Sequence, residues 1–212
     1  PIVLVLTNGS ALSVNWASEN IPAIIEAWYP GQEGGNAVAD VIFGNYNPAG
    51  RLPVTFYKSV NDLPEFEDYS MNGRTYKYFR SKPLYAFGYG LSYTSFEYGN
   101  AKLENESVTK TDTIRLSIPI RNVGRYDGDE VIQVYVKQPE NVKEKPIKSL
   151  VAFERLHLLK GDSRIISISI PVSRLRHYNQ EIGEYDISIG NYELLIGAAS
   201  DDIKIKVGIS VK

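Results

Sequence analysis

Few side chains in this sequence have the types and the spacing that a chemical reaction needs. Glu33 and Asp40 lie seven residues apart on an expected helix, so both carboxylates share one face but stand about 10 Å apart along the axis. Two carboxylates that act together as nucleophile and acid need a separation of about 5 Å. This pair therefore predicts no active site by itself, and Glu33 is expected to complement the helix dipole.

Other reaction types lack their residues. The sequence contains no cysteine, which excludes a thiolate nucleophile, a disulfide framework and a zinc–sulfur site. His157 and His177 have no regular metal-ligand spacing. The turn at Gly31–Asn36 leads into a helix but lacks the Gly-Lys-Ser/Thr ending of a phosphate loop. The sequence therefore predicts neither a metal site nor a cofactor.

The balance of charge also excludes some partners. The chain has 212 residues, and 23 Lys and Arg residues against 25 Asp and Glu residues give a net charge of −2. No general basic field would attract nucleic acid or anionic lipid. The longest apolar run, Ile2–Leu6, is far shorter than the roughly 18 residues of a membrane span. We expect neither a nucleic-acid partner nor a membrane partner.

Aromatic side chains are concentrated in one connector, residues 59–96, which we call the strap. Eleven of the thirty-three residues from Phe66 to Tyr98 are aromatic, so the strap is expected to be ordered against a domain surface. Sugar rings present flat C–H faces to aromatic rings, and Arg74, Tyr76, Tyr78 and Arg80 could border a carbohydrate cleft. Packing between two domains is the other interpretation, and the composition alone favours it.

The residues before the strap have the pattern of an α/β fold. Ile2–Leu6 predicts a buried parallel strand and Ile21–Tyr29 a second one. Gln32–Phe43 predicts a helix that Gly44 closes, and Leu52–Tyr57 predicts a last short strand. Two or three strands and one helix cannot cover both faces of a parallel sheet. This half is therefore expected to be incomplete.

The residues after the strap predict an all-β sandwich. Residues 114–120 and 203–211 alternate between apolar and polar positions, and Pro119 is expected at an edge or a bulge. Gly190-Asn191 predicts a two-residue hairpin between strands Tyr185–Ile189 and Tyr192–Ile196. Further strands are expected at Val131–Gln138, Leu150–Leu158 and Ile165–Val172. Seven or eight strands without a cysteine pair favour a fibronectin type III-like sandwich.

Several long motifs resemble one known family. Trp28–Gly44, Asn47–Phe56 and Pro83–Phe96 are similar to the C-terminal part of glycoside hydrolase family 3, which comprises β-glucosidases, β-xylosidases and related exo-acting enzymes. Val123–Val136 and Gly197–Ile203 resemble motifs of the fibronectin-like domain of that family. The resemblance covers essentially the whole chain.

The resemblance implies a division into domains and a location for the catalytic residues. Residues 1–58 would be the end of an α/β sandwich domain, 59–96 an ordered connector, and 97–212 a fibronectin type III-like sandwich. In this family a (β/α)8 barrel carries an aspartate nucleophile and the α/β domain carries a glutamate acid/base, with retention of configuration. Both carboxylates are expected upstream of Pro1. The chain alone is therefore expected to be inactive, and to support the barrel and the rest of the α/β domain.

The resemblance also bears on the substrate. Gly73–Phe79 is similar to the loop of the β-xylosidase-like branch, which favours β-xylosides or arabinosides over β-glucosides. Arg74, Tyr76 and Tyr78 are then the residues expected beside the oligosaccharide or aryl glycoside bound by the parent protein. The habits of the family favour a periplasmic or secreted location, and no cofactor is implied.

Two alternatives stay open. The chain could be a non-catalytic carbohydrate-binding or cell-surface module, although such a module has no need of an incomplete parallel sheet. It could also be a fragment whose truncated α/β half exposes apolar strands. In that case residues 1–57 should drive self-association, because uncovered strand edges pair readily.

Overall fold

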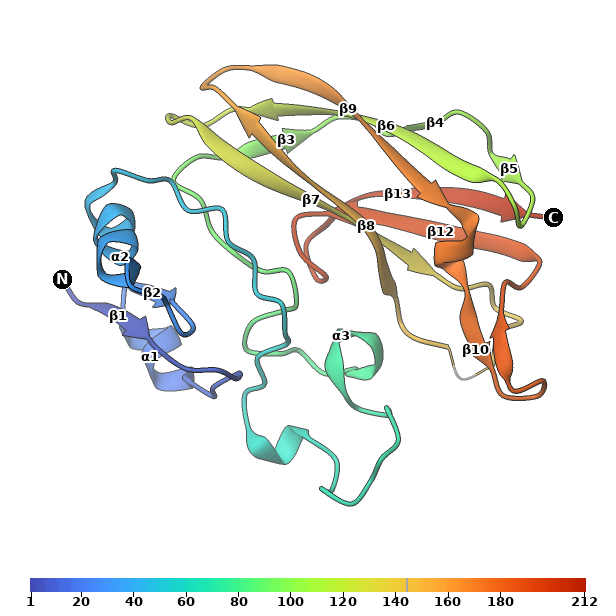
Figure 1. Cartoon of the computed structure of the whole chain (residues 1–212), viewed down its shortest axis with the longest axis horizontal. Coiled ribbons are helices and arrows are strands. Elements are labelled where there is room, and N and C mark those ends of the chain that lie inside the picture. The colour runs from blue at the N-terminus through green and yellow to red at the C-terminus, as the bar shows by residue number, and fades with distance from the viewer. Residues whose placement is uncertain (144) are drawn as a thin grey trace.

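The computed structural model describes residues 1–143 and 145–212. An α/β half and an all-β half lie at opposite ends of the molecule, and the strap runs between them (Figure 1). The elements before the sandwich are β1 (Val3–Leu6), α1 (Asn15–Asn20), β2 (Ala23–Glu26), α2 (Gly34–Phe43), a 3-10 turn (Val60–Asp62) and α3 (Thr75–Tyr78). This order confirms an α/β segment followed by an all-β sandwich.

The α/β half consists of one parallel strand pair and two helices. β1 and β2 pair in parallel, as the sequence predicts, and form a two-stranded sheet. α2 ends at Gly44, whose φ of 79° is the left-handed conformation that glycine adopts easily. The expected burial of β1 is wrong for this chain, because Val3 and Val5 remain 39% and 37% exposed.

Two local predictions in this half differ from the structure. Leu52–Tyr57 does not form a strand: Phe56 makes only an isolated bridge to Tyr85 of the strap. The segment has no neighbouring strand to pair with, and Pro53 offers no N–H. Helix α1 was not predicted because it has six residues and its N-cap, Val14, makes no side-chain capping bond.

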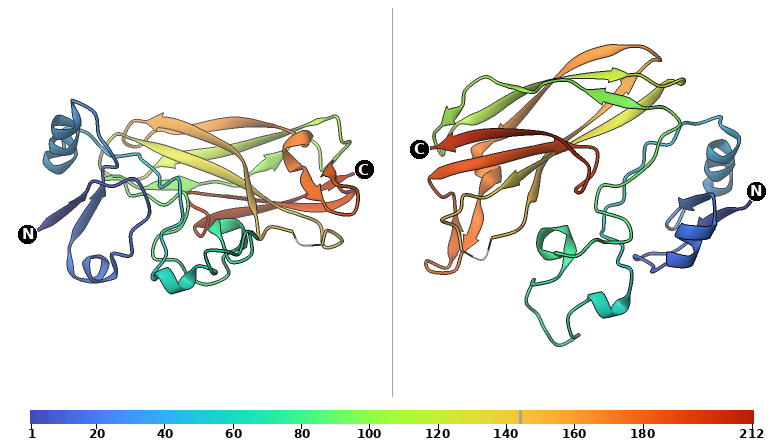
Figure 2. Two further views of the ribbon diagram at one scale, coloured as in Figure 1. Left: turned by 60° about the horizontal axis from the view of Figure 1, so that its bottom comes forward. Right: turned by 180° about the vertical axis from the view of Figure 1, so that it is seen from behind.

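The all-β half consists of two packed sheets (Figures 1 and 2). One has the order β5-β13-β12-β7-β8, and in the other β6 pairs with β9 on one side and with β3 and β4 on the other. The strands are β3 (Phe96–Tyr98), β4 (Lys102–Leu103), β5 (Ser107–Val108), β6 (Thr113–Asn122), β7 (Gly128–Lys137), β8 (Ser149–Leu158), β9 (Ser163–Pro171), β12 (Gly190–Gly197) and β13 (Ile203–Val211). A 3-10 turn (Val172–Leu175) follows β9.

The alternation in residues 114–120 fixes which face of β6 enters the core. Ile114, Leu116, Ile118 and Ile120 are at most 1% exposed, as the period of two predicts. Pro119 lies within β6, and its carbonyl accepts a bond from Gly99, between the end of β3 and the start of β4. Its missing N–H therefore faces the break between these two short strands, where no ladder bond is lost.

The predicted hairpin at Gly190-Asn191 is wrong. β11 (Glu184–Asp186) pairs instead with β10 (His177–Asn179), and β12 begins at Gly190 and pairs with β7 and β13. Gly190 has a φ of 147° and lies so close to Pro139 that a Cβ atom would stand 3.2 Å from the proline Cβ. Here glycine allows a close approach to a neighbouring loop and does not form a turn.

Candidate functional site

The two carboxylates singled out from the sequence, Glu33 and Asp40, each bind a neighbouring side-chain amide. Glu33 is the N-cap of α2, where its carboxylate accepts a bond of 2.5 Å from the amide of Asn36. Asp40 accepts a bond from Asn45 instead. Glu130 is the one buried acidic residue among those described, and Arg51 neutralises its charge. Each of these three carboxylates is therefore engaged by a nearby side chain.

The polar side chains that do converge lie at the junction between the two halves. Tyr46, Asn47 and Arg51 come from the loop after α2. Asn47 and Arg51 reach the turn before β7 and its beginning, and Tyr46 accepts a bond from Arg155 of β8. Sequence analysis missed these three residues because their partners in the sandwich lie 79 to 109 positions away. We call this group the junction.

Asn47 joins three segments. Its side-chain oxygen accepts bonds from Ser92 Oγ at 3.0 Å and from the backbone N–H of Tyr93 at 2.8 Å. Its side-chain amide donates to the backbone oxygen of Asp127 at 2.8 Å. The strap and the sandwich are therefore both held to the loop that ends the α/β half.

Arg51 and Glu130 form the buried part of the junction. The guanidinium lies 3.4 Å from the carboxylate, and the two side chains are 9% and 5% exposed. Tyr98 donates to the same carboxylate at 3.1 Å. Burial and then the nearby charge of Glu130 raise the pKa of Tyr98, so its hydroxyl stays protonated and remains a donor.

Asp129 forms the exposed part of the junction. It accepts bonds of 2.6 Å from Arg155 and from His157, and Arg155 also donates to the hydroxyl of Tyr46 at 2.9 Å. Partial burial acts to raise the pKa of Asp129, but the hydrogen bonds from His157 and Arg155 outweigh it and lower that pKa.

Replacing Asp129 with asparagine should lower stability by about 1 kcal/mol at neutral pH, because its partners are half exposed. An aspartate whose pKa is lower in the folded state stabilises the protein above the unfolded pKa, and this contribution is lost as the pH falls through the folded pKa. We therefore expect Asp129→Asn to flatten the loss of stability below about pH 4.

Thermal unfolding between pH 2 and pH 7 measures this effect. Glu97→Gln is the matched control, since Glu97 is exposed and makes no ion pair among the described residues. Equal slopes for the parent chain and Asp129→Asn would contradict the role assigned to Asp129.

Aromatic rings of the strap pack on both halves. Tyr76 stacks on Phe87 with centroids 4.3 Å apart, and both rings meet the edge of Tyr135 in β7. On the other side, Tyr85 packs on Phe56 at 6.2 Å and donates to Ser18 of α1. Among the two interpretations of the strap, these contacts support packing between domains for this part of it.

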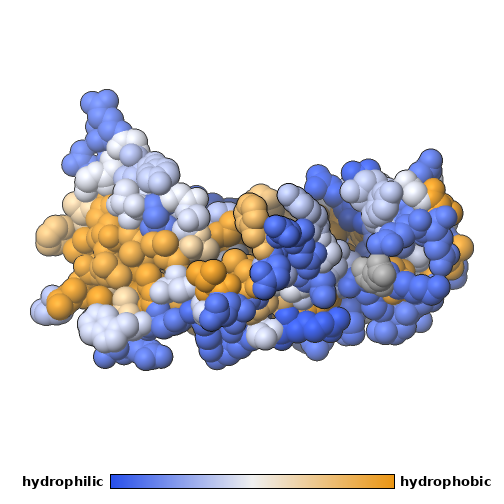
Figure 3. All heavy atoms as spheres, turned by 90° about the horizontal axis from the view of Figure 1, so that it is seen from below, coloured by the Kyte–Doolittle hydropathy of each residue, from blue (hydrophilic) through white to orange (hydrophobic). Residues whose placement is uncertain are grey.

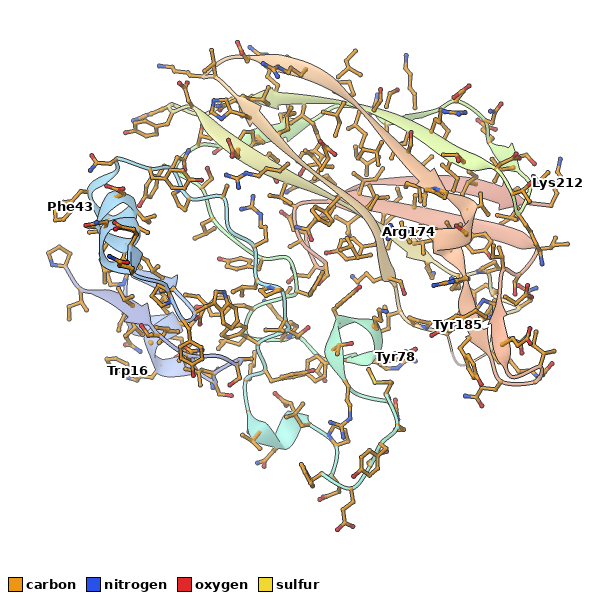
Figure 4. All side chains as sticks on the ribbon, viewed as in Figure 1. Trp16, Phe43, Tyr78, Arg174, Tyr185 and Lys212 are labelled. Atoms are coloured by element: carbon orange, nitrogen blue, oxygen red, sulfur yellow. The ribbon has the colours of Figure 1, made fainter. Side chains whose placement is uncertain are left out.

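The three predicted site residues have different surroundings. Arg74 donates to the backbone oxygens of Glu65, Asp68 and Ser70, so it closes its own loop. The hydroxyl of Tyr76 accepts a bond of 3.0 Å from the backbone of Leu150. Tyr78, half-buried on α3 (Figure 4), makes no side-chain hydrogen bond among the described residues.

A broad apolar surface covers the α/β half. Seen from below, hydrophobic atoms gather on the left of the molecule, over this half (Figure 3). Trp16 and Phe43 lie in the same half (Figure 4) and are 71% and 80% exposed. Its other exposed large apolar residues include Ile2, Val3, Val5, Leu12, Tyr29 and Ile42. A patch of this kind is typical of a surface that another domain covers.

Within residues 1–143 and 145–212, no group of three His, Asp or Glu side chains is placed to hold a metal ion. His157 and His177 lie on β8 and β10, and His157 is bound to Asp129. No described helix is long and apolar enough to cross a membrane.

Comparison with known proteins agrees with this architecture. Residues 1–93 match the model of the glycosyl hydrolase family 3 C-terminal domain, and residues 130–200 match that of the fibronectin type III-like domain. A xylan 1,4-β-xylosidase of Xylanibacter ruminicola is 44% identical over 205 residues, which are 97% of this chain and 23% of that protein. A periplasmic β-glucosidase of Salmonella typhimurium is 36% identical over 216 residues, with coverages of 96% and 28%.

Among solved structures, β-glucosidase 3B from Thermotoga neapolitana in complex with glycerol superposes with a TM-score of 0.89 at 36% identity. The superposition covers 99% of this chain and 31% of that one. An α/β segment followed by a fibronectin-like sandwich thus defines the C-terminal region of a class of glycoside hydrolases. The chain belongs to glycoside hydrolase family 3, and it spans less than a third of the length of these relatives.

Proposed function

We propose that the chain is the supporting C-terminal part of a retaining, exo-acting β-glycosidase. The whole parent protein would hydrolyse terminal β-glucosides or β-xylosides, and both catalytic carboxylates would lie in its other part. The coverage carries this proposal, because the chain matches only the C-terminal domains of this family and 23% and 28% of the length of the two curated relatives. The uncovered face of the α/β half, next to a junction that holds it to the sandwich, supports the bracing role.

Hydrolysis of nitrophenyl β-glucoside, β-xyloside and α-arabinoside by the chain and by the parent protein tests the proposal. We expect the chain to stay at the uncatalysed rate while the parent is active. The preferred sugar of the parent then identifies the substrate, with β-xyloside or arabinoside expected. Hydrolysis by the chain alone would place the catalytic carboxylates within these 212 residues and overturn the proposal.

We also propose the domain division at residues 1–58, 59–96 and 97–212, with the barrel and the rest of the α/β domain as partners of the first part. The exposed apolar face supports this, because a two-stranded parallel sheet normally has neighbours. Without them we expect the isolated chain to self-associate at micromolar concentration. Light scattering should show oligomers of the isolated chain, and the double variant Val3→Lys/Val5→Lys should abolish them. A monodisperse monomer would count against the predicted self-association.

We propose Arg74, Tyr76 and Tyr78 as the residues of this chain nearest to the substrate of the parent protein. Tyr78 has a hydroxyl that no described residue engages, so it is the one expected to bind a sugar hydroxyl. Loss of one such bond costs about 0.5–1.5 kcal/mol. We therefore expect Tyr78→Phe to raise the KM of the parent roughly two- to tenfold, with little change in kcat.

Tyr192→Phe is the matched control, because Tyr192 lies in β12 of the sandwich and its hydroxyl already donates to the backbone oxygen of Ser188. It should lower stability and leave KM within about twofold. An unchanged KM for Tyr78→Phe would remove Tyr78 from the substrate site.

A further inference from the structure

The outer end of the strap carries the two most exposed large hydrophobic side chains of the described residues. Phe66 is 93% exposed and Tyr69 is 91% exposed, and Leu63 and Met71 beside them are also exposed. We call Leu63–Met71 the strap tip. No described aromatic ring contacts Phe66 or Tyr69, whereas the rest of the strap is rich in ring contacts.

The strap tip is a structured loop. Ser59 and Asp62 form a reciprocal capping box at its entry. Beneath it, Arg74 donates to the backbone oxygens of Glu65, Asp68 and Ser70, and the carboxylate of Asp68 accepts the backbone N–H of Ser70. The hydrogen bonds fix the backbone and leave both aromatic rings in solvent. Such preorganisation lowers the entropy that binding would otherwise cost.

Another exposed aromatic pair shows how different this is. Tyr178 and Tyr185, on β10 and β11, are 56% and 66% exposed, but their rings meet edge to face at 5.6 Å. Arg176 also covers the ring of Tyr185 at 5.0 Å. These tyrosines shield one another within the chain, whereas no described ring or cation covers Phe66 or Tyr69 in this way.

Neither the α/β half nor the sandwich of this chain lies over the strap tip. In two views it projects beyond the α/β half and the sandwich (Figures 1 and 2). The apolar face at Val3 and Val5 belongs to the α/β half, and the strap tip is separate from it. More than two thirds of the length of the relatives lies outside the residues that match this chain. A further body is therefore available to cover the strap tip.

We propose that the strap tip docks on the catalytic part of the parent protein, with Phe66 and Tyr69 inserted into an apolar pocket. Glu65, Glu67 and Asp68 are neighbours of the two aromatic residues in the sequence, so we expect the rim of that pocket to be basic. The inference rests on the proposed function in one respect, since it requires a catalytic part outside this chain. Docking through the strap tip would hold the sandwich and the catalytic part in one orientation.

Hydrogen exchange of the backbone amides of residues 63–71 tests this surface in the full-length parent and in the isolated chain. We expect at least tenfold slower exchange in the parent, and loss of that difference in the parent variant Phe66→Ser/Tyr69→Ser. The control Tyr178→Ser/Tyr185→Ser should leave the protection unchanged. Because the rim of the pocket is expected to be basic, raising the salt concentration should weaken the protection of these amides.

Equal exchange of these amides in the parent and in the chain would overturn the docking proposal. Protection that rises with protein concentration would also overturn it, because a second copy would then be the cover. Activity of the isolated chain on nitrophenyl glycosides would instead overturn the proposed function. The two failures are therefore distinguishable.

Discussion

Replacing Arg51 with methionine should lower the free energy of unfolding by about 3–5 kcal/mol, because it leaves the carboxylate of Glu130 buried without a counter-charge. Removal of one partner of a buried ion pair is much more costly than removal of both. The hydroxyl of Tyr98 would remain as a donor to Glu130 but cannot neutralise it. Urea unfolding followed by tyrosine fluorescence measures the change.

The double variant Arg51→Met/Glu130→Leu is the control for this result. It removes both charges, and we expect it to recover most of the lost stability. A loss below 1 kcal/mol for Arg51→Met would contradict the burial of this pair. Equal losses for the single and double variants would show that side-chain packing, and not charge, holds the junction together.

Replacing Gly88 with alanine should lower stability by about 3–5 kcal/mol. Gly88 has a φ of 81°, and an added Cβ would meet the side-chain oxygen of Gln133 at 2.0 Å. Gln133 cannot move freely, since its amide donates to the backbone oxygens of Gly88 and Ala198 and its oxygen accepts from Tyr135. The left-handed backbone costs about 1–2 kcal/mol, and the disrupted buried bonds cost the rest.

Gly44→Ala separates the two contributions. Gly44 has nearly the same φ, 79°, but no atom lies within 4 Å of an added Cβ. It should therefore show only the backbone cost of about 1–2 kcal/mol in the same unfolding experiment. Equal losses of stability for Gly88→Ala and Gly44→Ala would contradict the close contact between Gly88 and the side chain of Gln133.

Helices and strands were predicted best where the spacing of apolar residues fits only one kind of element. The alternation of β6 and β13 and the apolar face of α2 each identify an element without knowledge of its neighbours. Leu52–Tyr57 has the same local appearance, but a strand needs a partner, and only Tyr85 bridges it. Gly190 likewise has the composition of a turn, whereas its conformation is set by Pro139.

The junction could not be predicted for the same reason. Nothing near Arg51 in the sequence indicates that Glu130 will be its partner, and Asn47 resembles an ordinary turn residue before proline. The only local indication of the junction is the cluster of acidic residues Asp127, Asp129 and Glu130. For the strap, composition predicted order and packing, but it could not predict which rings face inward and which face solvent.

During synthesis, the α/β half leaves the ribosome before the strap that contacts it. In the folded chain, Ser18 is bonded by Tyr85 of the strap and the carbonyl of Val41 in α2 by Tyr93. At roughly 5–20 residues per second, the strap of about forty residues follows over roughly 2–8 s. During this interval the nascent α/β half lacks the two contacts that the strap later supplies.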